Sequence, residues 1–214
     1  MIFADPKVQQ VFDEYEVRAA ADAALMDELG PAGRARRDEF LLPVGAEAAA
    51  FLHALIVARR PRRILELGTS YGYSTLVLAD AARAVGGQLV TMELADYKQA
   101  YARERLARAG LAQHVDLRCG DAVAMIADDP GQWDFVLLDI WKDLYEPCFE
   151  AFYPQLADEG VICSDNMIEP AGARPSVRLY REAIRRKSDL QSALLPVGQG
   201  IELTVRWSAG NAKL

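Results

Sequence analysis

The chain has 214 residues, of which 51% are hydrophobic and 26% charged, and its net charge is −7. This length and composition predict one soluble domain with a single buried core, and no apolar run approaches the roughly 18 residues of a membrane span. The negative charge disfavours a general nucleic-acid binder.

The cysteines and the first residues favour a cytoplasmic protein. Cys119, Cys148 and Cys163 are odd in number and share no close spacing, which is typical of reduced thiols rather than of a disulfide framework or a zinc site. Residues 1–12 lack the basic region and apolar stretch of a secretory signal. We therefore expect a cytoplasmic protein without a membrane segment.

The first part of the chain predicts helices. Apolar residues recur at helical spacing over residues 8–29, and the Gly30-Pro31-Ala32-Gly33 run predicts the end of that helix. A polar, basic linker follows, and a second helix is expected over residues 46–58.

From Arg63 onward the pattern alternates between strands and helices. The predicted strands span residues 64–67, 88–93, 115–118, 135–138 and 161–163, and the predicted helices span residues 74–84, 96–109, 147–156 and 174–187, with a short one after Asp121. Such alternation predicts a parallel sheet with helices on both faces. Two closing strands, residues 190–196 and 201–207, predict a hairpin that adds an antiparallel edge.

The turns after the first three strands suggest an adenosine site. Gly68 and Gly72 follow the first strand with a Gly-x-x-x-Gly spacing, which departs from the dinucleotide-binding pattern. Glu93 ends the second strand, where an acidic residue accepts ribose hydroxyls, and Asp121 after the third is placed to meet an adenine amino group. Because these residues follow successive strands, we expect a ligand that contains adenosine.

Two acidic signatures follow the next two strands. Asp139 comes after one apolar run, and Asp165 with Asn166 comes after another. Their three oxygen ligands suit a magnesium ion, with Lys142 nearby as a candidate general base. An isolated Asp at a strand end is more often a helix cap, so the metal prediction depends on the pair.

Taken together, these motifs resemble a known family. The residues that carry the resemblance are Glu66-Leu67-Gly68, Gly72-Tyr73-Ser74, Glu93, Gly120-Asp121-Ala122, Asp139 with Lys142 and Tyr145, and Asp165-Asn166. They resemble the cation-dependent class I O-methyltransferases, which use S-adenosylmethionine and include the catechol and caffeoyl-CoA enzymes. The resemblance covers roughly residues 43–207.

The resemblance implies an α/β fold of the Rossmann-like class I methyltransferase type. Its sheet would have seven mainly parallel strands, an antiparallel C-terminal edge hairpin and helices on both faces. Residues 1–214 would form a single methyltransferase domain, with an N-terminal helical segment over residues 1–43 and a catalytic core over residues 44–214.

The resemblance also implies the roles of the site residues. S-adenosylmethionine would be surrounded by Glu66, Gly68, Ser70, Gly72, Ser74, Glu93, Asp121, Ala122, Asp139, Trp141 and Val44. Mg²⁺ or another divalent cation would be held by Asp139, Asp165 and Asn166, with Lys142 as the catalytic base. The implied reaction is methylation of one hydroxyl of a catechol-like phenolic small molecule.

Other functions stay open at this level. Arg174, Arg178, Arg181 and Arg185 recur on one helix face, and some relatives of this fold methylate a hydroxylated uridine in tRNA. The plainer interpretation is a solvated helix face. A non-catalytic accessory subunit and a homodimer are further alternatives, and the pattern leaves open the acceptor, the metal and any substrate contact from Gln199 or Glu202.

Overall fold

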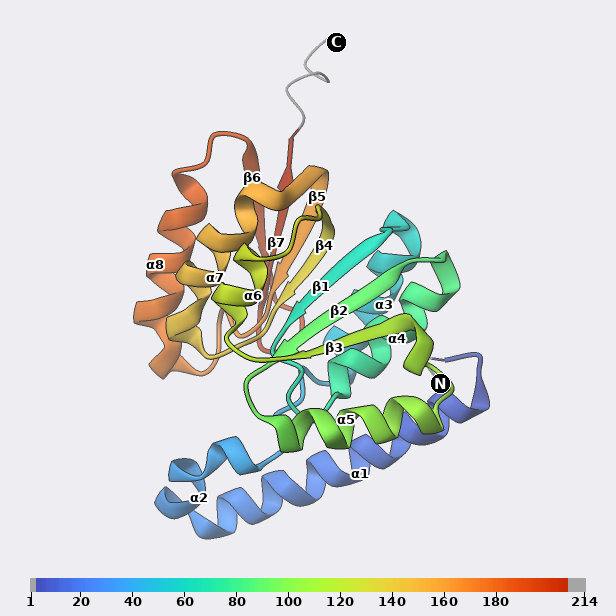
Figure 1. Cartoon of the computed structure of the whole chain (residues 1–214). Helices are drawn as coiled ribbons and strands as arrows, with labels where there is room; N and C mark the ends of the chain where they lie inside the picture. The colour runs from blue at the N-terminus through green and yellow to red at the C-terminus, as the bar shows by residue number, and fades with distance from the viewer. Residues whose placement is uncertain (1–2, 208–214) are drawn as a thin grey trace.

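The computed structural model describes residues 3–207, which form a seven-stranded sheet between two layers of helices (Figure 1). The strand order is β3-β2-β1-β4-β5-β7-β6. The strands are β1 (Arg63–Leu67), β2 (Gln88–Glu93), β3 (Val115–Cys119), β4 (Trp133–Leu138), β5 (Leu156–Ser164), β6 (Leu190–Leu195) and β7 (Ile201–Arg206). The first five pair in parallel, whereas β7 is antiparallel to both β5 and β6, as the sequence predicted.

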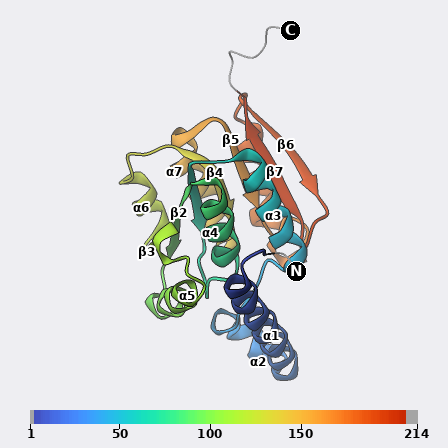
Figure 2. The ribbon, with the colours of Figure 1, turned by 90° about the vertical axis from the view of Figure 1, so that its right-hand side faces the viewer.

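Helices cover both faces of the sheet, each over its own apolar cluster. They are α1 (Pro6–Leu29), α2 (Pro31–Ala35), α3 (Ala46–Arg59), α4 (Tyr73–Val85), α5 (Asp96–Arg108), α6 (Ala122–Ala127), α7 (Tyr145–Phe152) and α8 (Arg174–Arg185), with 3₁₀ turns at Arg37–Glu39, Ala112–His114, Lys142–Leu144, Tyr153–Gln155 and Ala171–Ala173. Buried residues of α1, α3, α4 and α5 pack against one face, and those of α6, α7 and α8 pack against the other (Figures 1 and 2). The two clusters confirm the predicted three-layer α/β fold.

The N-terminal helices lie near the carboxyl end of the first strands (Figure 1). The Tyr15 hydroxyl on α1 donates to the carbonyl oxygen of Tyr71 at 2.6 Å, and the Tyr71 hydroxyl donates to the carbonyl oxygen of Glu39 at 2.9 Å. The Arg18 guanidinium stacks over the Tyr71 ring at 3.9 Å. These contacts place the N-terminal segment against the loop between β1 and α4.

Two sequence predictions need correction. The helix expected over residues 147–156 ends at Phe152, and Leu156 is already the first residue of β5. Pro154 explains the early end, because it has no amide hydrogen to continue the helical hydrogen bonds. The linker expected after Gly33 instead contains α2 and a 3₁₀ turn, because Pro31 is suited to the first position of a helix.

Two further features concern the cysteines and the helices of the described residues. All three thiols are free: Cys119 is exposed, while Cys148 and Cys163 are buried. Among residues 3–207, no helix has both the length and the apolar character needed to cross a membrane.

Candidate active site

The carboxyl edge of the sheet gathers the predicted site residues. Backbone bonds continue past the strands at this edge: the Asp139 amide donates to Leu67 O at 3.0 Å, and the Asp165 amide donates to Leu138 O at 3.1 Å. The ends of β1, β4 and β5 are therefore aligned side by side. This alignment places the predicted cofactor turn next to the predicted metal ligands.

Gly68 makes this close alignment possible. Its φ is +102°, and a Cβ atom at this position would lie 2.1 Å from the carbonyl oxygen of Asp139. Gly72 has φ +93° and faces a different neighbour, because its Cβ would lie 2.7 Å from the Ala102 Cβ on α5. Gly68 thus lets the turn after β1 lie directly against the loop after β4. Gly72 lets α4 begin close to α5.

Glu66 is fully buried under the turn. Its Oε2 accepts hydrogen bonds from the Thr75 and Thr91 hydroxyls, each at 2.6 Å, whereas its Oε1 has no partner. Burial raises the pKa of Glu66 to about 7, against its hydrogen bonds with Ser74, Thr75 and Thr91, which lower it. The orphaned oxygen leaves an acceptor for a ligand donor at this point.

Glu93 organises the backbone around the turn. Its Oε2 accepts from the Ser70 amide at 2.9 Å, and its Oε1 accepts from the amides of Leu94 and Ala95 at 2.9 and 3.0 Å. Ser70 itself has a left-handed φ of 46°. Each carboxylate oxygen can accept a further hydrogen bond, which leaves room for the ribose hydroxyls. The ribose contact of Glu93 stays a prediction.

Asp121 acts as a helix cap in this structure. Its Oδ1 accepts from the Ala124 amide at 2.8 Å at the start of α6, while the following residue, Ala122, is buried. The structure thus places Asp121 at a strand end as predicted and adds a local structural role.

Two other predicted cofactor residues differ in exposure. Val44 is buried in the cluster on the α3 face. Trp141 is 40% exposed, and the Arg37 guanidinium lies 4.6 Å from its ring centroid.

Lys142 connects the two acidic signatures. Its Nζ donates to Asp139 Oδ1 at 3.3 Å, to the carbonyl oxygen of Ile140 at 3.1 Å and to the Tyr145 hydroxyl at 2.5 Å. The Tyr145 hydroxyl in turn donates to the carbonyl oxygen of Asp165 at 3.0 Å. Burial raises the pKa of Tyr145 well above its usual value, so this phenol stays protonated and keeps its donor.

Asp165 is a buried carboxylate without enough partners. Only 2% of the residue is exposed, and its Oδ1 has no hydrogen-bond partner. Burial, and then the charge of Asp139, raise the pKa of Asp165 to about 7. A charge that is both buried and repelled by a second carboxylate is costly, and a cation between the two would offset that cost.

Asn166 is held with its amide oxygen available. Its Nδ2 donates to Gln199 Oε1 at 2.6 Å, which leaves Oδ1 for another partner. The φ of Asn166 is +56°, a conformation that asparagine adopts more easily than most residues. The sequence left Gln199 open as a substrate contact and did not predict that it would bind Asn166. It also did not predict that Tyr145 would link Lys142 to Asp165.

The donor set fits a hard divalent cation. Two carboxylates and one amide oxygen are the oxygen ligands that magnesium uses, and one of them is an orphaned buried atom. Within residues 3–207 no group of three or more His, Cys, Asp or Glu side chains is arranged for a metal. The predicted set has only two acidic members, so its third ligand would have to be the Asn166 amide.

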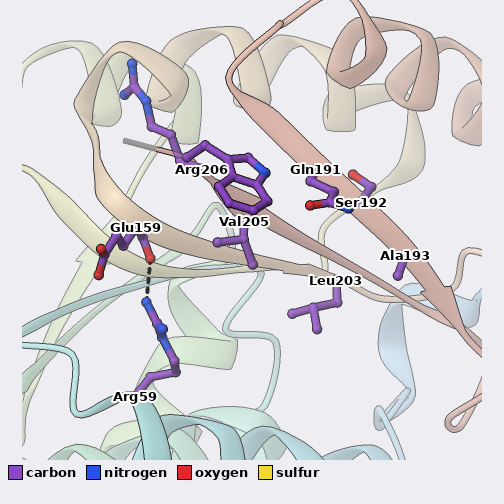
Figure 3. A pocket seen from close by; sticks show the side chains of 9 residues that line it. Arg59, Glu159, Gln191, Ser192, Ala193, Leu203, Val205 and Arg206 are labelled. Atoms are coloured by element: carbon purple, nitrogen blue, oxygen red, sulfur yellow. Dashed lines mark hydrogen bonds between the residues drawn. The ribbon is translucent and has the colours of Figure 1, made fainter. Parts of the chain in front are cut away.

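A separate groove lies on the β6–β7 side of the sheet (Figure 3). It measures about 450 Å³ and is lined by residues of β6 and β7 together with Arg59, Glu159 and Trp207. The Arg59 guanidinium donates to the carbonyl oxygen of Glu159 at 2.8 Å. None of the predicted cofactor, metal or catalytic residues lines it. The groove and the carboxyl-edge site are therefore distinct.

Known proteins share this architecture. A solved structure of the O-methyltransferase TomG from Streptomyces achromogenes, involved in tomaymycin synthesis and bound to S-adenosylmethionine, superimposes with a TM-score of 0.69 and 29% identity. The match covers 77% of this chain and 81% of TomG. This similarity agrees with the Rossmann-like methyltransferase fold seen here.

Curated relatives are similar in sequence. A catechol O-methyltransferase of Niastella koreensis is 30% identical over 131 residues, covering 59% of each protein, so the chain spans less than two thirds of that relative. A caffeoyl-CoA O-methyltransferase of Zea mays is 27% identical over 187 residues, covering 78% of this chain and 72% of the maize protein.

A family model described as O-methyltransferase matches residues 16–207. The matched region runs from α1 to the end of β7 and includes the carboxyl-edge site. The family resemblance predicted from the motifs is confirmed, and the chain belongs to the O-methyltransferase family.

Proposed function

We propose that this protein transfers the methyl group of S-adenosylmethionine to one hydroxyl of a vicinal diphenol, with the help of a divalent cation. The proposal is supported most directly by the surroundings of Asp139 and Asp165. Asp165 Oδ1 is buried without a partner, and Lys142 Nζ lies 3.3 Å from Asp139 Oδ1. A family member with two such carboxylates beside a lysine would have the parts for metal-assisted O-methylation.

Asp139, Asp165 and Asn166 would hold the cation. A bound Mg²⁺ would act as a Lewis acid that lowers the pKa of a coordinated hydroxyl. Three protein oxygens leave room for two adjacent substrate oxygens in octahedral coordination, which favours a vicinal diphenol as the acceptor.

Lys142 is the proposed general base. Its three hydrogen bonds, to Asp139, Ile140 and Tyr145, use all the donors of an ammonium group. To serve as the base, Lys142 would reach the acceptor hydroxyl through Nζ as a free amine and would give up one of these three bonds. Lys142 Nζ would accept the hydroxyl proton, and the substrate oxygen would bond to the methyl carbon as the carbon–sulfur bond of S-adenosylmethionine breaks with its electron pair going to sulfur.

The turn after β1 would position the methyl donor. Glu66 and Glu93 present acidic acceptors at successive strand ends, and the start of α4 directs free amides toward the same edge. Since methyl transfer needs little covalent help, holding oxygen and methyl in attack geometry supplies much of the rate, on the order of several kcal/mol.

The test measures transfer of labelled methyl from S-adenosylmethionine to a panel of vicinal diphenols, with Mg²⁺ and with excess chelator. We expect chelator-sensitive transfer that falls at least about 100-fold in Asp165→Ala, since the cation contributes several kcal/mol. Binding of Mn²⁺, followed by electron paramagnetic resonance, should be lost in the same variant.

Asp158→Ala is the matched control, because Asp158 is an exposed aspartate at the other end of β5. It should leave both transfer and Mn²⁺ binding unchanged. Full transfer in chelator would remove the cation from the mechanism, and no transfer to any diphenol would remove the acceptor class.

A further inference from the structure

The two edge strands of the sheet differ in how they are protected. β3 and β6 are the outermost strands, so each is bonded to one neighbouring strand only. β3 carries Asp116 and Arg118, whose Oδ2 and Nε atoms lie 2.8 Å apart. Charged side chains on an edge strand are one way in which proteins prevent another chain from adding to a sheet. β3 is therefore a protected edge.

β6 lacks this protection. Its six residues, with the sequence LQSALL, include no charged residue, proline or glycine, and four of them are exposed. Its register with β7 runs from Leu190 opposite Arg206 to Leu195 opposite Ile201 without a shift, so no bulge turns the strand aside. Within residues 3–207 no strand pairs with its outer side, which forms the right-hand edge of the sheet in Figure 2. A regular, uncharged edge strand of this kind is a template for a further strand.

The pairing with β7 shows which backbone groups of β6 point outward. The Trp207 amide donates to the carbonyl oxygen of Asp189 at 2.7 Å, which makes these opposite residues a hydrogen-bonded pair. Such pairs alternate along an antiparallel ladder, so the odd-numbered residues of β6 bond to β7. The even-numbered residues Leu190, Ser192 and Leu194 therefore direct their amide and carbonyl groups away from β7.

We propose that β6 pairs with β6 of a second copy of this chain, antiparallel and around a two-fold axis. Two identical antiparallel strands form a closed, self-complementary interface of this symmetry. Outward residues must face outward residues, and the register that uses all three places Ser192 opposite Ser192 of the second copy. Two seven-stranded sheets are thereby joined into one continuous sheet. The inference goes beyond the proposed function and does not depend on it.

The backbone groups that this register joins are available. The two Ser192 residues exchange a pair of hydrogen bonds, and each Leu194 amide donates to Leu190 O of the second copy, which gives about four bonds in all. The Leu190 amide is the exception, because it already makes a long hydrogen bond of 3.4 Å to the carbonyl oxygen of Lys187. The centre of the interface is therefore at Ser192.

The side chains of β6 also fit this register. On one face of the sheet, Leu194, which is 38% exposed, lies opposite Leu190 of the second copy, so that two apolar side chains meet. On the other face, Gln191 lies opposite the small Ala193 of the second copy. Each contact occurs twice because of the two-fold axis, and none of them buries a charged side chain.

The apolar groove beside β6 adds contact area. A stable interface buries about 1,000 Å² or more in total, which exceeds what a single pair of strands covers. The groove of about 450 Å³ in Figure 3 lies along β6 and β7, and Trp207 in its lining is 57% exposed. Its two guanidinium groups already have partners, since Arg206 pairs with Asp189 at 2.8 Å and Arg59 donates to Glu159 O at 2.8 Å. A second copy can therefore cover this surface without leaving a guanidinium unpaired.

The interface lies on the hairpin that reaches the candidate active site. The turn between β6 and β7 carries Gln199, whose Oε1 accepts a hydrogen bond from Asn166 Nδ2 at 2.6 Å. Pairing at β6 therefore also holds the hairpin that orients a predicted metal ligand.

The first test measures the mass of the chain in solution. Sedimentation equilibrium at micromolar concentration should give twice the 23.6 kDa of one chain. Ser192→Lys places two ammonium groups opposite each other at the two-fold axis, and this should raise the dissociation constant of the dimer at least about 100-fold. Ser192→Ala is the matched control. It removes the same hydroxyl, which lies 2.7 Å from Thr204 Oγ1, but adds no charge, and it should stay dimeric.

Three outcomes of this test would overturn the proposal. A wild type that sediments as one chain would leave the edge of β6 to an extended peptide from another protein. A dimer that persists in Ser192→Lys would show that the two copies meet elsewhere. Equal dissociation of Ser192→Ala would trace the effect to the hairpin rather than to charge at the axis. Matching far-ultraviolet circular dichroism spectra of the two variants would show that both are folded.

The second test reads the register directly. Opposite residues that are not hydrogen-bonded have Cα atoms about 4.5 Å apart, a distance that a disulfide can span. After the subunits have exchanged, a mixture of Gln191→Cys and Ala193→Cys chains should therefore crosslink when oxidised with diamide. Both chains also carry Cys119→Ser, which removes the exposed native thiol.

Each of these chains alone provides the control. Its two introduced cysteines would lie on a diagonal of about 7–8 Å, so it should crosslink at least about tenfold more slowly than the mixture. Equal rates in the mixture and in either chain alone would overturn this register and with it the proposal.

Discussion

The two halves of the carboxyl edge handle their carboxylates differently. At β2 and β3, Glu93 and Asp121 are satisfied by backbone amides of the chain itself. At β4 and β5, Asp139 lies beside Lys142, and Asp165 keeps a buried oxygen without a partner. Glu66 shares both characters, with two hydroxyl donors and one orphaned oxygen.

This difference shows what each half is built for. Carboxylates that already bind backbone amides fix the shape of a loop, so that a neutral or donor-bearing ligand finds a preformed surface. Carboxylates that are buried and mutually repelling are satisfied only when a cation joins them. The comparison predicts that substitutions in the second half affect chemistry most, and those in the first half affect folding.

The largest expected effect is on catalysis in the β4–β5 half. Lys142→Met should lower kcat by about 10²–10⁴-fold, which is the usual contribution of a general base. Calorimetric binding of S-adenosylmethionine should change far less than kcat, because Lys142 contacts Asp139, Ile140 and Tyr145 but neither Glu66 nor Glu93. Lys7→Met, at an exposed position of α1, serves as the control. A Lys142→Met enzyme with normal kcat would contradict the assignment of the base.

The next effect is on the junction between the halves. Gly68→Ala should lower the free energy of unfolding by about 3 kcal/mol or more, because the new Cβ meets the Asp139 carbonyl oxygen at 2.1 Å in a left-handed backbone. Gly110→Ala, at φ +72° with open space around it, should cost only about 1 kcal/mol. Urea unfolding measures both, and equal costs would show that the close approach is unimportant.

A smaller effect concerns pH and Glu66. The pKa of this residue is raised from 4.5 to about 7, so the stability linked to its protonation is fully present below about 4.5 and is lost as pH rises through about 7. Glu66→Gln should lack this loss and should exceed the wild type at pH 8 by up to a few kcal/mol. The two proteins should converge near pH 4.

Thermal melts of both proteins across that pH range provide the measurement. Asp165, whose pKa is also raised to about 7, contributes a similar loss to both proteins, so only their difference reports on Glu66. A difference that does not change with pH would show that Glu66 keeps the same charge in the folded and unfolded states.

The smallest expected effect is on the orientation of Asn166. Gln199→Ala removes the acceptor of its Nδ2 and should weaken Mn²⁺ binding by about 1 kcal/mol, the typical value of one hydrogen bond. Gln113→Ala, which removes an exposed glutamine from a distant turn, should have no effect on binding. If Gln199→Ala binds Mn²⁺ as tightly as the wild type, Asn166 is oriented by its backbone alone.

Much of the fold could be predicted because its signals are local. Apolar runs, glycine turns and helical spacing indicated all seven strands and the antiparallel hairpin. Where the prediction was wrong, a competing local signal had been overlooked: Pro154 ends α7 early, and Pro31 starts a short helix in the expected linker. An aspartate after a strand is often a helix cap, and Asp121 caps α6 in the structure. Its predicted contact with an adenine stays a prediction.

The sequence alone determined the order of the elements and therefore which carboxylates share one edge, because parallel strands with right-handed crossovers bring their carboxyl ends together. Only the tertiary structure decided which of those carboxylates keep unsatisfied oxygens. That outcome depends on contacts between distant residues, such as Gln199 with Asn166, and on burial, which left Asp165 and Glu66 away from water. Hydrogen-bond partners and desolvation are set by packing in three dimensions, and spacing along the chain does not encode them.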